Sequence, residues 1–290
     1  MLKNIFTIRA LTQRQSSPDV QKDCQLIIAH VLQKQLSSIL AHPEQHLSMM
    51  QFLRVQSLLR KRQKNVPLAY ILGEKEFFGR DFVVTKDVLV PRPETEILVE
   101  KVLEHSKDIN SDLIVDIGTG SGCIAITMAK ELKNTETAFV AVDISQEALR
   151  IAEKNARNHD VAKRIAFRAA DLLANDALQK KIRESSDVIF AVNLPYVDMT
   201  QKESLLQQQE SKALAHEPAQ ALWSKKSGLA HYERLISQTK NLNKKHIRNF
   251  YEIDPDQTEQ LATLIHARFP DAKITFHNDL SGRARVCEWS

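Results

Sequence analysis

Apolar positions in the first part of the chain recur at helical spacing. Ser17 followed by Pro18 is a typical helix start, and the next apolar residues, from Val20 to Leu32, fall on one face of a helix. Ser48 with Gln51 three residues later forms a capping-box pattern at a second helix start. Basic residues 60–64 then suit the last turn of that helix. Residues 1–66 are therefore predicted to form a small all-helical domain.

The pattern changes beyond Pro67. Residues 77–84 read as a strand pair that turns near Gly79, which gives a linker over residues 67–90. Residues 91–290 then alternate short apolar runs with helical stretches, which predicts a mostly parallel sheet covered on both faces. The candidate strands are Leu113–Ile117, Ala138–Val142, Arg164–Arg168, Val188–Val192, Arg248–Ile253 and Lys273–His277.

Composition narrows the class of protein without identifying it. Hydrophobic residues at 43% and charged residues at 26% are ordinary for a globular enzyme. The formal charge of +4 is too small to indicate nucleic-acid binding by itself, although it suits an acidic or ribonucleoprotein partner. Three cysteines without CxxC spacing predict neither a zinc site nor disulfides, and no apolar run reaches the roughly 20 residues of a membrane helix. We expect a cytoplasmic protein without a metal or a membrane partner.

The N-terminus allows two interpretations. The first 14 residues carry Lys3, Arg9 and Arg14 with no acidic residue, which is compatible with a targeting segment. A solvated helix start accounts for the same residues more simply and is the interpretation we prefer.

A glycine-rich turn supplies the first candidate site. Gly118, Thr119, Gly120, Ser121 and Gly122 lie between an apolar strand and a predicted helix. Glycines there let the backbone approach a ligand at the carboxyl end of a strand. The spacing is G-x-G-x-G, not the G-x-G-x-x-G of dinucleotide-binding proteins. It is the pattern of class I methyltransferases, and it predicts S-adenosyl-L-methionine as cofactor and S-adenosyl-L-homocysteine as product.

Two acidic positions extend this cofactor site. Asp143 ends the next predicted strand, where a carboxylate can accept both hydroxyls of a ribose. The alternative is that Asp143 caps the helix starting near Gln146, although Ser145 can serve that purpose. Asp171 and Leu172 follow the third strand, where class I enzymes contact adenine, but an Asp after a strand is also common in loops.

The candidate chemical site is Asn193-Leu194-Pro195-Tyr196, after the apolar strand 188–192. An amide nitrogen is a poor nucleophile because its lone pair is delocalised, so a useful site accepts hydrogen bonds from both of its N–H groups. The Asn193 side-chain oxygen and a backbone carbonyl can do so, Pro195 stiffens the turn, and Tyr196 offers a flat face to a planar group. The alternative is a plain strand-ending turn.

The chain resembles the peptide chain release factor glutamine methyltransferases nearly from end to end. Beyond the motifs above, the shared segments are Arg60–Gly73, Glu76–Gly79, Val88–Glu96, Glu217-Pro218, Ala221-Leu222, Gly228-Leu229, Glu252-Ile253, Gln257 and Asp279–Val286. The resemblance implies a class I, Rossmann-like α/β fold behind a helical N-terminal domain that helps recognise the release factor. It further implies methylation of the amide nitrogen of the glutamine in that factor's Gly-Gly-Gln motif.

By the same resemblance, residues 118–122, Asp143, Leu172 and Asn193 contact the cofactor, and residues 193–196 hold the glutamine. One position departs from the family, which usually has Asn-Pro-Pro-Tyr where Leu194 stands here. Asn-Leu-Pro-Tyr also occurs in ribosomal RNA adenine dimethylases, so adenine-N6 methylation of ribosomal RNA is the alternative. The Pro-Arg-Pro-Glu-Thr-Glu segment and the N-terminal place of the helices favour the release factor. A protein that binds its ligands without turnover is a third hypothesis, which a methyl-transfer assay tests.

Overall fold

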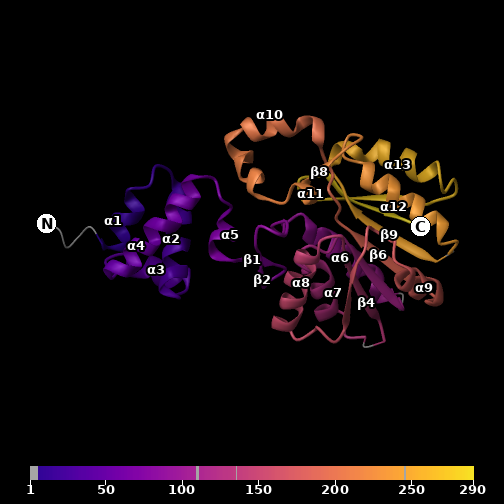
Figure 1. Cartoon of the computed structure of the whole chain (residues 1–290), viewed down its shortest axis with the longest axis horizontal. Helices are drawn as coiled ribbons and strands as arrows, with labels where there is room; N and C mark the ends of the chain where they lie inside the picture. Colours follow the sequence, from indigo (N-terminus) through magenta and orange to yellow (C-terminus); the bar gives the residue numbers. More distant parts are fainter. Residues whose placement is uncertain (1–5, 109–110, 135, 245) are drawn as a thin grey trace. The chain divides into compact units, whose positions relative to one another are not determined.

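The computed structural model describes residues 6–108, 111–134, 136–244 and 246–290, so Lys3 lies outside the described residues. The chain forms two compact units, residues 1–73 and 74–290, and each has its own hydrophobic core. Figure 1 shows the first as a group of helices and the second as a sheet with helices on both faces.

The first unit is all-helical. Its helices are α1 (Ile8–Gln13), α2 (Pro18–Leu32), α3 (Leu36–Ala41), α4 (Met49–Gln63) and α5 (Leu68–Leu72). Thr7 caps α1, and the predicted caps are confirmed, since Ser17 accepts a hydrogen bond from Val20 and Ser48 forms the capping box with Gln51. The unit extends beyond residue 66 because α5 packs on the same core.

The second unit is built on a seven-stranded sheet. Its strands are β3 (Leu113–Ile117), β4 (Ala138–Asp143), β5 (Ile165–Ala169), β6 (Val188–Val192), β9 (Ile247–Glu252), β10 (Ile274–Asn278) and β11 (Ala284–Trp289). Their order is β10-β11-β9-β6-β3-β4-β5, and five neighbouring strands are parallel while β11 is antiparallel to both neighbours. The predicted mostly parallel sheet is confirmed, and β11 is an addition that the sequence pattern did not predict.

The sheet has helices on both faces, as the alternation of strands and helices predicted. One core contains Ile114 and side chains of α6 (Thr95–Asp108), α7 (Cys123–Glu131) and α8 (Gln146–Asn158). The opposite core contains Val115 and side chains of α9 (Asp176–Glu184), α12 (Ala230–Asn241) and α13 (Thr258–His266). Alternate residues of each strand therefore serve opposite cores.

Two irregular parts complete this unit. The strands β1 (Glu74–Phe77) and β2 (Arg80–Val83) form the predicted hairpin around Gly79. The segment after β6 contains β7 (Val197–Asp198), η2 (Met199–Gln201), α10 (Lys202–Gln207), η3 (Gln209–His216), α11 (Ala219–Leu222) and β8 (Trp223–Ser224), and η4 (Pro255–Gln257) follows β9. Over the described residues, no helix has the length and apolar character that a membrane crossing requires.

Candidate active site

A cavity of about 240 Å³ lies at the carboxyl ends of β3, β4 and β6, as the rule for open α/β sheets predicts. The structure brings ten of the twelve predicted site residues into its wall: Gly118, Thr119, Gly120, Ser121, Asp143, Asp171, Leu172, Asn193, Leu194 and Pro195. Gly122 and Tyr196 are not among the lining residues. Gly122 instead caps α7, and Tyr196 turns toward the strand β9.

The glycine loop is shaped by backbone hydrogen bonds. The N–H groups of Gly118 and Thr119 both donate to the Val142 carbonyl, at 2.8 and 2.9 Å, which joins the loop to the end of β4. Gly118 has φ +82°, and a β-carbon there would lie 3.0 Å from the Leu194 side chain. Gly120 has φ +55°, and a β-carbon there would lie 4.0 Å from the Gly118 carbonyl oxygen, at ordinary contact distance. Glycine is therefore required at 118 both for its conformation and for the close approach of the next turn.

Two buried side chains, neither of which was predicted as a site residue, hold the loop from behind. The Asp116 carboxylate accepts hydrogen bonds from the Thr119 hydroxyl at 2.6 Å and the Ala125 N–H at 3.1 Å. Burial raises the pKa of Asp116 to about 7 against these two hydrogen bonds, which lower it. The Asn155 amide donates to the carbonyls of Ser121 and Val83, tying the loop to the hairpin.

Asp143 braces the loop from the end of β4. One carboxylate oxygen accepts from the Gly120 N–H and the other from the Ser145 N–H, both at 2.9 Å. Burial raises the pKa of Asp143 against these hydrogen bonds. Ser145 itself caps α8 by accepting from Ala148, so the helix does not need Asp143 as its cap. Each carboxylate oxygen retains a lone pair that a ligand can use.

Beside Asp143, the wall of the cavity includes the apolar side chains of Ile144 and Leu172. Ile144 lines it and is 62% exposed, an unusual degree for a large aliphatic side chain. Leu172 is buried, with φ +58°, in the wall of the same cavity. Asp171 forms an exposed ion pair with Arg234 at 2.5 Å. The apolar side chains offer surface to a flat ring, and the ion pair fixes the Asp171 carboxylate at the rim.

Asn193 follows β6 directly, and both N–H bonds of its side chain point back into the protein. Its Nδ2 donates to the Thr95 hydroxyl at 3.1 Å and to the Glu252 carboxylate at 2.8 Å. Thr95 begins α6 and Glu252 ends β9, so two distant segments set the orientation of one amide. The Asn193 carbonyl oxygen is thereby left as the acceptor of the pair.

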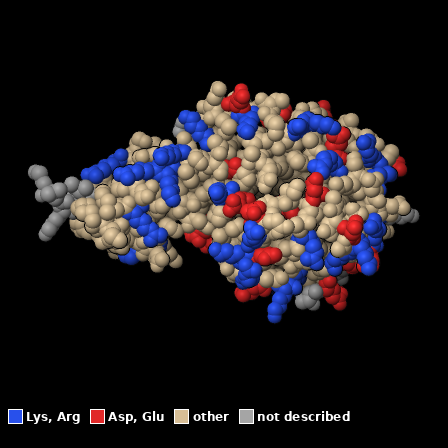
Figure 2. Space-filling view, viewed as in Figure 1, with Lys and Arg blue, Asp and Glu red and all other residues tan. Residues whose placement is uncertain are grey.

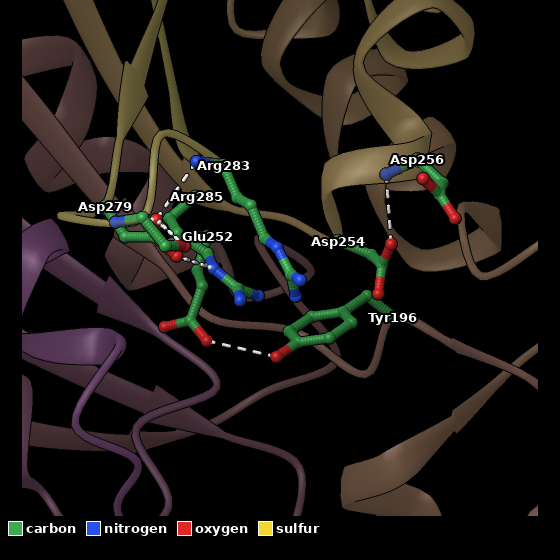
Figure 3. Close-up of polar contacts among 8 residues, drawn as sticks. Tyr196, Glu252, Asp254, Asp256, Asp279, Arg283 and Arg285 are labelled. Carbon is green, nitrogen blue, oxygen red and sulfur yellow. Dashed lines mark hydrogen bonds and ion pairs between the residues drawn. The ribbon is translucent and has the colours of Figure 1, made fainter.

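Glu252 is the centre of this arrangement, and only the family resemblance had drawn attention to it. It is 1% exposed and also accepts a hydrogen bond from the Tyr196 hydroxyl at 3.2 Å (Figure 3). Burial raises its pKa to about 7, whereas hydrogen bonds from Thr95 and Tyr196 lower it. Burial also raises the pKa of the Tyr196 hydroxyl, so this group is a donor, not a base. We expected the ring of Tyr196 to offer a flat face to the substrate. Its hydroxyl is instead bound to Glu252, and Tyr196 is not among the residues that line the cavity.

Leu194, in the turn after β6, contacts the glycine loop with its side chain. Its side chain is buried against Gly118, while its carbonyl lies 3.5 Å from the Tyr232 hydroxyl, at the limit of hydrogen bonding. Tyr232 donates a closer bond to the Glu252 carbonyl. The Leu194 carbonyl thus keeps acceptor capacity for a ligand.

Two further sets of hydrogen bonds hold the segments next to the Asn193–Tyr196 turn. The Glu217 carboxylate accepts from Arg92 at 2.6 Å and from the Val90 N–H at 3.1 Å, which joins two cavity-wall segments. Behind Tyr196, the Gln257 amide donates to the carbonyls of Tyr196 and Ser227. Gly228 fits there with φ +86°, where a β-carbon would lie 1.9 Å from the Tyr196 carbonyl oxygen.

Comparison with known proteins shows which families the two units match. Residues 7–73 match the PrmC N-terminal domain, and residues 110–266 match a methyltransferase domain. The release factor glutamine methyltransferase of Clostridium botulinum is 34% identical over 92% of this chain and 90% of its own length. That of Coxiella burnetii is 34% identical over 91% and 89%. A bifunctional methyltransferase of Rickettsia bellii is 31% identical, and the chain spans 50% of that protein.

Solved structures give the same fold at greater distance. The hMettl16 catalytic domain in complex with a MAT2A 3′UTR hairpin has a TM-score of 0.57 and 17% identity, over 77% of this chain and 79% of that one. This likeness shows a shared class I methyltransferase fold alone. The match of residues 7–73 to the PrmC N-terminal domain and the relatives at 34% identity are more specific. They show that the chain belongs to the release factor glutamine methyltransferase family.

Proposed function

We propose that the protein transfers a methyl group from S-adenosyl-L-methionine to the side-chain amide nitrogen of the glutamine in the Gly-Gly-Gln motif of peptide chain release factors. The observation that carries the proposal is the orientation of Asn193. Both of its N–H bonds are engaged by Thr95 and Glu252, so its oxygen is the group available to an incoming amide. The curated relatives support the protein substrate over the alternative, adenine in ribosomal RNA.

The residues of the cavity fit the cofactor. Asp143 has spare lone pairs for two ribose hydroxyls, and the exposed Ile144 with Leu172 offers apolar surface to adenine. Gly120, which lines the cavity at φ +55°, has no β-carbon between its backbone and a ligand. When bound, S-adenosyl-L-methionine supplies a methyl group made electrophilic by a positively charged sulfur.

The chain itself orients the glutamine. The Asn193 oxygen and the Leu194 carbonyl accept one N–H bond each from the substrate amide and hold its nitrogen in place. Two fixed acceptors favour the build-up of positive charge on that nitrogen as it is methylated, and they do not move during the reaction. No strong base is needed, because the proton becomes acidic once the methyl group is attached.

The helical unit suits recognition of the release factor. Residues 1–73 contain ten Lys and Arg against three Asp and Glu, whereas residues 74–290 contain 30 against 33. Several of these basic side chains are visible on the helical unit in Figure 2. The exposed apolar residues Met49, Met50 and Leu53 lie on α4 beside Arg54. Such a surface favours an acidic protein partner with apolar anchors.

The function is tested by incubating the purified chain with labelled S-adenosyl-L-methionine and, separately, a release factor, a short Gly-Gly-Gln peptide and ribosomal RNA. We expect one methyl group on the glutamine of the factor and none on the RNA. Labelled adenine with an unlabelled factor would reverse the assignment.

The same assay tests the helical unit. Arg60→Glu with Lys61→Glu should lower kcat/KM on the intact factor several-fold and leave the peptide unchanged, with Lys180→Glu plus Lys181→Glu on α9 as the control of equal charge. Equal losses on factor and peptide would assign the unit to stability.

A further inference from the structure

We propose that Glu252 is the positioning residue that fixes which end of the Asn193 side-chain amide faces the cavity. This inference rests on the proposed function and deepens it. A terminal amide has a donor end and an acceptor end of almost the same shape, so packing alone does not choose between its two orientations. A reversed Asn193 would present an NH₂ group to the substrate nitrogen, where only an acceptor is useful.

Glu252 can make that choice because an ionised carboxylate only accepts hydrogen bonds. Its two oxygens receive the Asn193 Nδ2 at 2.8 Å and the Tyr196 hydroxyl at 3.2 Å. Reversing Asn193 would bring an amide oxygen against a buried carboxylate oxygen, which is unfavourable. The second partner of Asn193, the Thr95 hydroxyl, accepts as well as donates and so does not choose by itself.

A hairpin turn supplies the countercharge for this buried group. Asp279 accepts hydrogen bonds from the Ser281 side chain, the Arg283 N–H and the Arg285 Nε, and the last of these pairs is 2.9 Å long. Figure 3 shows the side chain of Arg285, which lies in β11 directly after this turn, extending toward Glu252. The positive charge of Arg285 lowers the pKa of Glu252 and so favours its ionised form.

The other groups facing Glu252 come from several elements. Glu94, just before α6, raises the pKa of Glu252. The neutral side chains of Tyr232 on α12 and Cys123 on α7 also lie within its field, as does Tyr196. Because the pKa is about 7, Glu252 is ionised above that pH and loses its exclusive acceptor character below it.

The test is a double-mutant cycle on the full chain with a release factor as substrate. Glu252→Gln keeps the shape but turns one acceptor into a donor. It should lower kcat about 10- to 100-fold, since a buried donor loses its partner. The KM for S-adenosyl-L-methionine should stay within about twofold, because Glu252 itself is not among the residues that line the cavity. In an Asn193→Ala background the same substitution should have almost no further effect, because the group it positions is gone.

Glu288→Gln on the neighbouring strand β11 is the matched control. This partly buried carboxylate pairs with Arg248 and His277 away from the cavity, so its loss should leave kcat unchanged. Melting temperatures of both variants show whether Glu252→Gln acts through stability. Full additivity of Glu252→Gln and Asn193→Ala would overturn the proposal.

A pH profile tests the inference without altering Glu252. At saturating cofactor, kcat of the wild type should fall with a single-proton limb near pH 7 as Glu252 is protonated. Arg285→Met removes the countercharge and should move this limb to higher pH, whereas Glu252→Gln should abolish it. An unchanged limb in Glu252→Gln would contradict the assignment. A wild type that methylates no release factor would instead refute the proposed function.

Discussion

The two turns that meet in the cavity are constructed in different ways. The glycine loop after β3 is held by backbone groups, such as the Val142 carbonyl that receives two of its N–H groups, and by side chains no more than 34 residues away along the chain. The turn after β6 depends on side chains far away in sequence, since Thr95 and Glu252 lie 98 and 59 residues from Asn193. The first turn shapes a surface for the cofactor, and the second sets the orientation of one functional group.

This difference determines how each turn fails. Backbone contacts persist through most side-chain replacements, so the glycine loop should be vulnerable chiefly where a β-carbon intrudes or where Asp143 is lost. The Asn193 turn keeps its fold when a side chain changes, but the amide then loses its direction. We therefore expect changes in the first turn to alter cofactor affinity and changes in the second to alter turnover.

The largest effect on turnover is expected for Asn193→Ala. Removing one preorganised hydrogen-bonding group of this kind costs roughly 10²–10³ in turnover, about 2.7–4 kcal/mol. Steady-state kinetics on a release factor should show this fall in kcat, and KM for the factor should rise where the same side chain also binds the ground state. Near-normal turnover would remove Asn193 from the mechanism.

Asp143→Ala should come next and should act on affinity. If Asp143 binds the ribose as proposed, the substitution removes two charge-assisted hydrogen bonds, each worth roughly 1.5–3 kcal/mol, and also releases the Gly120 N–H. Titration calorimetry should show weaker binding of S-adenosyl-L-methionine. An unchanged dissociation constant would reject the ribose assignment, and a tight complex with NADH would reject the reading of the glycine spacing.

Gly118→Ala tests the point where the two turns touch. A positive φ costs an L-residue about 1–2 kcal/mol, and here the new β-carbon also presses on Leu194 at 3.0 Å. We expect a lower melting temperature and cofactor binding weakened about tenfold or more. Gly73→Ala has a matching φ of +81° with nothing within 4 Å, so it carries the backbone strain alone. An equal fall in melting temperature in both variants would show that contact with Leu194 is unimportant.

The smallest effect is expected for Leu194→Pro, which restores the usual family motif. The contribution of residue 194 to substrate binding is a backbone carbonyl, which any residue supplies, and proline stiffens the turn. Activity on a release factor should persist or rise modestly. If Leu194→Pro abolishes that activity while the wild type dimethylates ribosomal RNA adenine, the protein substrate is wrong.

The same contrast explains what the sequence could predict. The glycine loop and Asp143 stand at the ends of two consecutive predicted strands, and the helix caps depend on neighbours within a few residues, so spacing along the sequence indicated them. The mostly parallel sheet followed from the alternation of strands with helices, whereas the order of the strands and the antiparallel β11 did not. Asn155, Thr95 and Glu252 reach the site only through the tertiary fold. Nothing in the apolar pattern around residue 252 distinguishes a buried carboxylate that orients an amide from a polar residue at a strand end.

Gly228 has a consequence for how this chain can vary. Its α-carbon lies against the Tyr196 carbonyl and the Gln257 amide so closely that a β-carbon would overlap both, at 1.9 and 2.2 Å. Every missense change of a glycine codon introduces a β-carbon, so the codon at this position has no neutral missense neighbour. Any substitution at position 228 is therefore expected to displace the Asn193–Tyr196 turn, although every side chain of that turn is unchanged in the sequence.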